Sequence, residues 1–581
     1  MGRLPESRSG SPPRRVLVVA AGLVVLALYW SFSDLLCFHS LVGHVPVPAA
    51  SAPLPIFKHS LCPQVKPLNP TKGDPLFQDI DAYLMSCEGK NWTIDSLSQA
   101  VRTPTQLFDD FELPGEDPRW DVMLDMHDFL RGRFPLVHAK LDIHKINRYG
   151  LVYTWKGSDE SLKPLVLTAH MDVVPVNPET RREWDQPPFS GLFDGNNVWG
   201  RGSADDKAML IGTITAIELL LQRGYMPRRT VILAYGFDEE RGGRNGARTI
   251  GQHLVELYGQ NGAAMLIDEG GQYFIHDDIV MAIPNVAEKG ALNVQIEVAT
   301  PGGHSSVPPA HTGIGVLSRI VALLEDNPFP AMLKRDSTYF RSLRCEAAYD
   351  DSFSDELRGY LARAISDDAA LKAAQKKLLQ LDENLFRAFA GTTQAVDVIH
   401  GGLKYNALPE RAHAIINHRI AEDSSVAETA SRYAQVLAPF ATRMNLTLES
   451  FGTMYGVQGP ADGHITVSTI RRGLNPAPVT PTEGSGAWEV LSGTILSSLD
   501  TSERAELAGK QIVVAPGIMI ANSDTKWYRR LTRNIFRYGH IGKTDRDGMH
   551  TVNEAIKAEG YIEGIRFYTR LILNVDESSL L

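Results

Sequence analysis

Acidic and histidine residues follow four apolar segments of this chain, at the points where those segments end. In order along the sequence they are His170-Met171-Asp172, Asp205-Asp206, Glu239-Glu240 and Asp268-Glu269. In an open α/β sheet the ligand crevice lies outside the carboxyl ends of the strands, so segments far apart in sequence meet there. We therefore expect these side chains to converge at one edge of a sheet.

Such a group of carboxylates favours a metal centre. Carboxylates crowded into one crevice repel each other, and their pKa values rise unless a cation is present. Imidazole and carboxylate ligands without thiolate suit zinc, with manganese or cobalt as substitutes. Two ions bridged by one carboxylate would lie about 3.5 to 4 Å apart and hold a water between them. The pattern therefore predicts a metal centre.

Each motif also has a simpler interpretation. A single histidine at a strand end is commonly only hydrogen-bonded, and Asp205-Asp206 could cap the following helix, because aspartate is favoured at helix N-termini. Glu239-Glu240 could form a solvated turn before Arg241. The recurrence at four successive strand ends favours the metal centre over these separate explanations.

The segments that carry these residues predict an α/β domain. Continuously apolar runs of strand length occur at 164–170, 229–237 and 263–268, and a helical stretch occurs at 205–224. Strands that are apolar throughout and joined by helices indicate a sheet covered on both faces.

A second unit, of α+β type, is expected inside this domain. The runs at 291–300 and 411–420 alternate between apolar and polar residues, which is typical of strands with one solvated face. Residues 352–390 between them have a strongly helical composition. We expect the inserted unit to span 290–450.

The N-terminus contains an apolar run at 16–33 that carries no charge and directly follows Arg14-Arg15. A cleaved signal peptide has a shorter apolar stretch of about 7 to 15 residues and a nearby small-residue cleavage site. We expect an uncleaved, single-pass type II signal anchor with a lumenal body; a cleaved signal peptide is the alternative. The predicted order is a cytosolic tail (1–15), a signal anchor (16–38), a stalk and N-terminal extension (39–118), a first catalytic part (119–289), the inserted domain (290–450) and a second catalytic part (451–581).

Composition narrows the possible functions. The 581 residues are 43% hydrophobic, which excludes disorder throughout, and a net charge of −10 without a long basic block argues against nucleic acid as a partner. Sequons at Asn91 and Asn445 agree weakly with a secreted glycoprotein.

Four cysteines are too few for a disulfide scaffold. We expect at most one bridge, between Cys62 and Cys87.

Six motifs stand in a characteristic order along the chain. They are AHMDVVP (169–175), WGRGSADDK (199–207), GFDEERGG (236–243), LIDEGG (266–271), PGGHSS (301–306) and DGMHTVNE (547–554). Together they resemble the di-zinc exopeptidase family that contains carnosinases, aminoacylases and bacterial glutamate carboxypeptidases, and within it the branch of the fungal vacuolar carboxypeptidase S, or Gly-Xaa carboxypeptidase. The resemblance implies a zinc-exopeptidase catalytic domain, an inserted lid and dimerisation domain, and a vacuole- or lysosome-like compartment.

The resemblance also implies a role for each residue of the metal site. One Zn²⁺ would be held by His170, Asp205 and Asp268, and a second Zn²⁺ by Asp205, Glu240 and His550. Asp172 would orient the imidazole of His170 without binding metal, as carboxylates next to ligating histidines do. Glu239 would be the general base.

Three further residues are implied to act on the substrate. His304 would stabilise the oxyanion, acting from the neighbouring subunit of a homodimer, although it could also be a histidine in a glycine-rich turn. Asn406 would lie near the substrate. Arg419 would bind the substrate's free C-terminal carboxylate, for which its planar guanidinium is suited. As an alternative, Arg419 could be an ordinary strand-face charge.

The predicted function is therefore that of a membrane-anchored di-zinc carboxypeptidase acting on short peptides. A preference for glycine at the penultimate position is implied by the resemblance alone. An N-acyl amino acid amidohydrolase or synthase of the same family is the first alternative. A metal-free receptor or adaptor ectodomain is the second, and the presence of all five ligands and the base argues against it.

Overall fold

The computed structural model describes residues 61–457 and 459–581. The predicted tail and signal anchor at 1–38 lie outside these residues. None of the helices in the described part of the chain is long and apolar enough to cross a membrane.

The first sheet contains the strands whose ends carry the predicted site. Its order is β1-β2-β6-β3-β7-β20-β9-β19, and β8 joins β7 to β18. The bounds are β1 Asp142–Ile146, β2 Gly150–Trp155, β3 Leu165–His170, β6 Val231–Gly236, β7 Met265–His276, β8 Ile279–Ala282, β9 Asn285–Glu288, β18 Gln511–Val514, β19 Gly517–Met519 and β20 Ile535–Gly542. Because β3 is parallel to both β6 and β7, the carboxyl ends of these three strands lie at one edge, as predicted. Asp205-Asp206 instead follows a turn, so the expected fourth strand end of this sheet is wrong.

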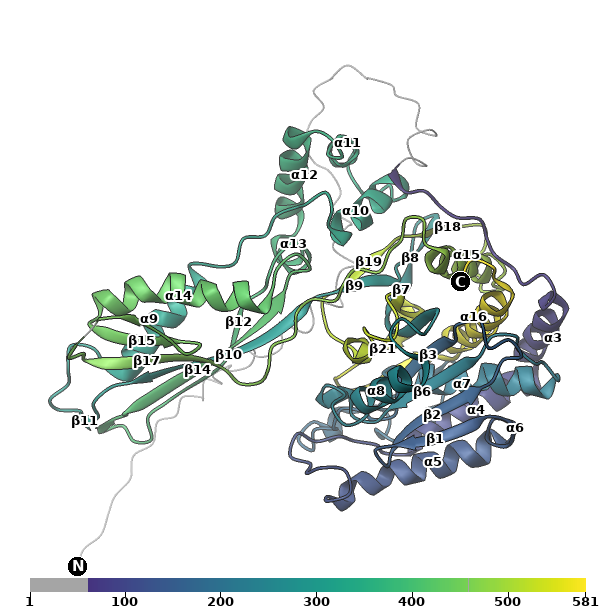
Figure 1. Cartoon of the computed structure of the whole chain (residues 1–581), viewed down its shortest axis with the longest axis horizontal. Coiled ribbons are helices and arrows are strands. Elements are labelled where there is room, and N and C mark those ends of the chain that lie inside the picture. The colour runs from purple at the N-terminus through teal and green to yellow at the C-terminus, as the bar shows by residue number, and fades with distance from the viewer. Residues whose placement is uncertain (1–60, 458) are drawn as a thin grey trace, which may run out of the picture. The chain divides into compact units, whose positions relative to one another are not determined.

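Helices cover both faces of this sheet (Figure 1). Helices α7 (Lys207–Gln222), α15 (Gly486–Asp500) and α16 (Ala558–Glu577) share one core with the sheet, and α8 (Ala247–Tyr258) packs in a separate core with strands β2, β3 and β6. Strands β3 and β6 are buried at every position. The predicted strands at 164–170 and 229–237 and the helix at 205–224 are confirmed.

The second sheet belongs to the inserted unit. Its order is β12-β14-β10-β17-β15-β16. The bounds are β10 Gly290–Ala299, β12 Ala395–Gly401, β14 Arg411–Ile420, β15 Leu446–Ser450, β16 Thr453–Gly456 and β17 Gly463–Thr469. Helices α9 (Gly313–Glu325) and α14 (Val426–Arg443) bury its apolar face, which confirms the one-sided alternation predicted for 291–300 and 411–420 (Figure 1). The sheet continues past residue 450, the predicted end of the insertion, because β17 pairs with β10 in its middle.

Four helices between α9 and β12 form a separate layer with its own core. They are α10 (Thr338–Tyr349), α11 (Asp355–Arg363), α12 (Asp368–Leu381) and α13 (Glu383–Ala390), and the last three confirm the helical stretch predicted at 352–390. Their core includes Ala287 of β9 and Ile518 of β19. This helical layer is therefore packed on strands of the first sheet.

The segment after residue 61 is folded onto the catalytic body, although the sequence predicts a stalk and extension over 39–118. Helices α3 (Asp74–Met85) and α4 (Cys87–Arg102) contribute Phe77, Leu84 and Leu97 to the core under α7 and α16. Helices α5 (Val122–Arg133) and α6 (Pro135–Lys140) follow. The buried leucine and phenylalanine side chains explain why this part is not an extended linker.

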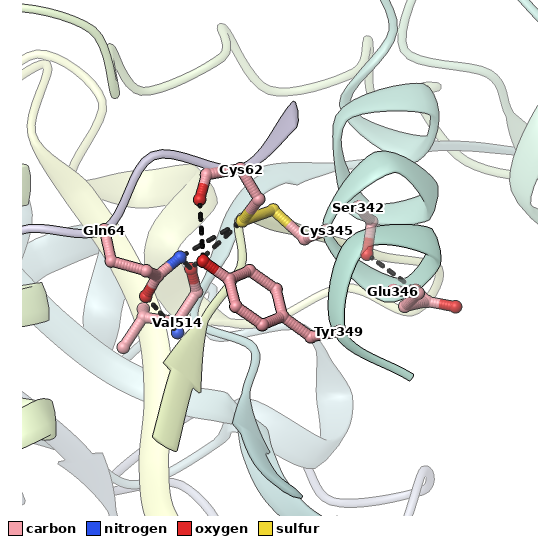
Figure 2. Close-up of a disulfide and its surroundings, with 7 residues drawn as sticks. All are labelled: Cys62, Gln64, Ser342, Cys345, Glu346, Tyr349 and Val514. Atoms are coloured by element: carbon pink, nitrogen blue, oxygen red, sulfur yellow. Dashed lines mark hydrogen bonds between the residues drawn. A yellow bond between two sulfur atoms is a disulfide. The ribbon is translucent and has the colours of Figure 1, made fainter. Parts of the chain in front are cut away.

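The disulfide differs from the predicted one. Cys62 pairs with Cys345 of α10, 283 residues away, and Cys87 is a free, exposed thiol, so the expected Cys62–Cys87 bridge is wrong. Figure 2 shows how the segment that follows Cys62 is held: the Gln64 amide donates to the Val514 carbonyl oxygen at 3.0 Å and accepts from the Val514 N–H at 2.8 Å. The bridge thus joins the helical layer to a segment that is hydrogen-bonded to β18.

We predict that Cys345→Ala destabilises the protein, because the bridge closes a long loop and restricts the unfolded chain. Loss of a native disulfide typically costs about 2 to 5 kcal/mol. Urea unfolding followed by fluorescence should show a lower midpoint for Cys345→Ala, and Cys87→Ala serves as the matched control. Equal midpoints for all three proteins would contradict the pairing.

Candidate active site

Asp205 lies between two histidines that come from opposite ends of the sequence. Its Oδ1 is 3.1 Å from Nε2 of His170, at the end of β3, and its Oδ2 is 3.1 Å from Nε2 of His550. Each carboxylate oxygen therefore faces a different imidazole. The peptide bond between Asp205 and Asp206 is cis.

Further carboxylates surround this arrangement. Oε1 of Glu240 is 3.3 Å from Nε2 of His550, and Oε1 of Glu269 is 3.8 Å from Nε2 of His170. Within the described ranges, two sets of three residues place possible ligand atoms within 4.8 Å of one another. These sets are His170, Asp205 and Glu240, and His170, Asp206 and Glu269.

The protonation equilibria show the cost of this crowding. Burial raises the pKa of Asp206 and of Glu269 well above their usual values, and the negative charge of Asp205 adds to the effect on both. Hydrogen bonds to Asp205 and Glu240 raise the pKa of His550 to about 10. Without a cation, protons therefore provide the positive charge that this cluster needs.

The donor set fits divalent metal ions. The ligand atoms are imidazole nitrogens and carboxylate oxygens, which suit zinc, and Oδ2 of Asp206 is buried without a hydrogen-bond partner among the described residues. Asp206 stands at the N-cap of α7 but makes no side-chain capping bond. Helix capping therefore does not explain the acidic pair.

Asp172 holds the loop that carries the two glutamates. Its Oδ1 and Oδ2 accept from the backbone N–H groups of Glu239 and Glu240 at 3.2 and 3.0 Å. Oδ1 also lies 3.4 Å from Nδ1 of His170, whose shorter contact, 2.9 Å, is to the Asp172 carbonyl oxygen. Asp172 thus contacts His170 and fixes the backbone of both glutamates.

Glu239 and Glu240 occupy different places. Glu240 belongs to one of the ligand sets, whereas Glu239 belongs to neither. Burial raises the pKa of Glu239 to about 8. A carboxylate with a raised pKa is suited to proton transfer when it lies beside the metal ligands without being one of them.

Glu554 is a buried residue that the sequence analysis missed. Its Oε1 accepts from the backbone N–H groups of Gly202, Ala204 and Asp205 at 3.0, 3.0 and 3.1 Å, and its Oε2 accepts from Arg201 at 2.5 Å. It therefore shapes the loop that ends in Asp205. The available signal was its place four residues after His550 in DGMHTVNE.

Asp268 and Glu269 share one corner of the site. Oδ1 of Asp268, the predicted ligand, accepts from the Thr168 hydroxyl at 2.7 Å, and burial raises the pKa of Asp268. The neighbouring Glu269, which the sequence analysis did not assign, is the one whose carboxylate lies beside His170.

His304 lies in a small two-stranded sheet, formed by β11 (Gly303–His304) and β13 (Ala407–Leu408), and Asn406 directly precedes β13. Both side chains are exposed. Nδ1 of His304 is 2.7 Å from the Ser306 hydroxyl. Across the described chain, neither residue shares a hydrogen bond or ion pair with the carboxylate cluster.

Arg419 lies at the end of β14 and is half-buried. Its Nη1 donates to Oδ1 of Asn522 at 2.7 Å. In the part of the chain that the structure describes, Arg419 has no ion-pair partner. A guanidinium without an ion-pair partner can bind an anion that comes from outside the protein.

Comparison with known proteins agrees with this geometry. Residues 166–574 match the model of "Peptidase family M20/M25/M40". Carboxypeptidase S of Saccharomyces cerevisiae is 39% identical over 525 residues, which cover 89% of each chain. The N-fatty-acyl-amino acid synthase/hydrolase PM20D1 of Mus musculus is 29% identical over 493 residues, covering 83% of this chain and 87% of the relative.

Solved structures show the same fold. Human carnosine dipeptidase 1 superposes with a TM-score of 0.58 at 14% identity, covering 88% of this chain and all of that one. The metallo-carboxypeptidase Sso-CP2 of Sulfolobus solfataricus gives a TM-score of 0.54 at 18% identity, covering 83% of this chain and 99% of that one. The family model spans the catalytic strand ends, the inserted unit and His550. The chain is thus a member of the M20/M25/M40 peptidase family.

Proposed function

We propose that this protein is a di-zinc carboxypeptidase that removes the C-terminal residue of short peptides. The observation that carries the proposal is Asp205, whose two oxygens each face a different histidine at 3.1 Å. A carboxylate in this position can bridge two ions. The proposed ligands are His170, Asp205, Glu240, Asp268 and His550, with Glu269 as an additional candidate at the Asp268 corner.

Each remaining residue has a defined task in this proposal. Bound zinc would polarise the scissile carbonyl. It would also lower the pKa of the attacking water, so that this water could lose a proton near neutral pH. Glu239 accepts the proton of the attacking water and returns it to the leaving amine. Asp172 holds the backbone of Glu239 in place, and Glu554 holds the loop of Asp205.

The substrate's terminal carboxylate is proposed to bind Arg419. Support comes from the half-buried guanidinium, whose partner Asn522 is neutral. A carboxylate held at this point would allow the last peptide bond to reach the attacking water. The preference for a penultimate glycine is carried over from the resemblance to the carboxypeptidase S branch.

Hydrolysis or synthesis of N-acyl amino acids is the second candidate. The matching Mus musculus relative is named for that activity. Both reactions require a free carboxylate on the amino acid, so the Arg419 site fits both. Peptides and N-acyl amino acids must be compared directly.

We also propose a homodimer and a lumenal location. The apolar side chains Val307, Leu403 and Tyr405 are exposed around His304 and Asn406, and a subunit interface would cover them. In that dimer His304 would act in the partner's site.

The disulfide supports an oxidising compartment, and a type II anchor at 16–38 and a vacuole- or lysosome-like destination follow from the sequence analysis.

We predict that Glu239→Gln keeps its metal but lowers kcat by a factor of about 10² to 10⁴, because it removes the general base and no ligand. Asp205→Asn should instead lose metal. Metal analysis and kinetics on the same samples separate the two effects. A Glu239→Gln enzyme with near-normal kcat at full metal occupancy would exclude Glu239 as the base.

We predict that a C-terminal amide lowers kcat/KM by about 10² or more, because the Arg419 guanidinium is left without an anion. Free-acid peptides, their amides and N-acyl amino acids should be assayed with wild type and Arg419→Ala. Arg419→Ala should reduce the rate with acids far more than with amides. Equal cleavage of acid and amide by wild type would rule out the carboxypeptidase assignment.

We predict that the metal-free protein loses stability as pH rises. In the folded state Glu239 and His550 have pKa values raised to about 8 and about 10, against ordinary values of 4.5 and 6.5. The folded state therefore holds protons that the unfolded state has released, and stability falls as pH rises through this range.

The Tm of chelator-treated protein should drop between about pH 6 and 9, and it should drop less steeply in Glu239→Gln. Added zinc should stabilise the protein more at higher pH. A metal-free Tm that is flat or rises over this range would contradict the arrangement.

A further inference from the structure

Asn522 connects the inserted unit, through Arg419, with the catalytic body. It lies between β19 and the short helix η4 (Asp524–Trp527) of the catalytic body. Its Oδ1 accepts from Nη1 of Arg419 at 2.7 Å, and its Nδ2 donates to the Lys289 carbonyl oxygen at 2.7 Å. Lys289 is the residue between β9 of the first sheet and β10 of the second. Because both ends of the amide are used, its orientation is determined.

The loop that carries Asn522 is firmly held. The next residue, Ser523, donates its backbone N–H to Oε1 of Glu288 at 2.8 Å. Glu288 is fully buried and pairs with Arg537 at 3.1 Å and Arg529 at 3.0 Å. The Ser523 hydroxyl also hydrogen-bonds Asp268, which offsets part of the rise that burial causes in the pKa of that carboxyl. One short loop thus links Arg419 with a residue of the proposed metal site.

The neutral side chain at position 522 has a specific consequence. An amide oxygen orients the guanidinium of Arg419 without neutralising its charge, so the positive charge stays available to a substrate carboxylate. A carboxylate at position 522 would form an ion pair with Arg419 and compete with the substrate. Arg419 makes no ion pair among residues 61–457 and 459–581, which agrees with this arrangement.

We propose that Asn522 is a positioning residue that holds Arg419 at a set distance from the metal site and keeps it free to bind the substrate's terminal carboxylate. The inference rests on the proposed carboxypeptidase function and extends it to a residue of the catalytic body. Asn522 contacts Arg419 and not the reacting atoms, so its effect should depend on the presence of Arg419.

The test compares kcat and KM for a peptide free acid and its amide in Asn522→Ala and Asn522→Asp. Asn417→Ala is the matched control, since Asn417 lies on β14 two residues before Arg419 and pairs with Asn293 on the exposed face. Both Asn522 variants should raise KM for the acid by about 10-fold or more, Asp more than Ala, with the amide nearly unchanged. Metal content should remain at the wild-type level.

A double-mutant cycle separates positioning from a merely structural role. In an Arg419→Ala background, Asn522→Ala should have no further effect on the ratio of acid to amide rates. The inference is overturned if Asn522→Ala and the near-isosteric Asn522→Asp keep the wild-type ratio while Arg419→Ala loses it. Equal rates for acid and amide in wild type would instead overturn the proposed carboxylate site, and this inference with it.

Discussion

The burial of several carboxylates around two histidines is the constraint on which the site depends. Negative charges at this density are unstable in a protein interior unless protons or cations accompany them. The surrounding structure holds the carboxylates in place against their repulsion. Asp172 binds the backbone of Glu239 and Glu240, and Glu554 binds the backbone on the way to Asp205. Two divalent ions would balance these charges and leave Glu239 free for proton transfer.

The fold brings this site together from both ends of the catalytic domain. Parallel strands β3, β6 and β7 supply the early residues at one edge of the first sheet. The inserted unit then leaves after β9, and the chain returns to the first sheet before it reaches His550. This path allows Arg419, on the inserted sheet, to meet Asn522 of the catalytic body. The proposed metal site and the proposed carboxylate site at Arg419 are therefore on different units, joined by the loop around Asn522 and Ser523.

Much of the fold and part of the site could be predicted from the sequence because local patterns encode them. Buried strands such as β3 and the one-sided strand β14 follow from hydropathy alone, and residues at parallel strand ends must converge. The disulfide was predicted wrongly because Cys62 and Cys87 are close in sequence, whereas the true partner, Cys345, is brought near only by the folded helical layer. Glu554 and Asn522 were missed for the same reason, since each acts through contacts with residues distant in sequence.

The most direct test of this account is the number and position of metal ions at Asp205. Metal-free protein should be titrated with zinc by calorimetry, and crystals of the loaded protein should be measured at the zinc absorption edge. The account predicts two ions per chain, about 3.5 to 4 Å apart, each bound to a different oxygen of Asp205. A single ion, or two ions that Asp205 does not bridge, would contradict it.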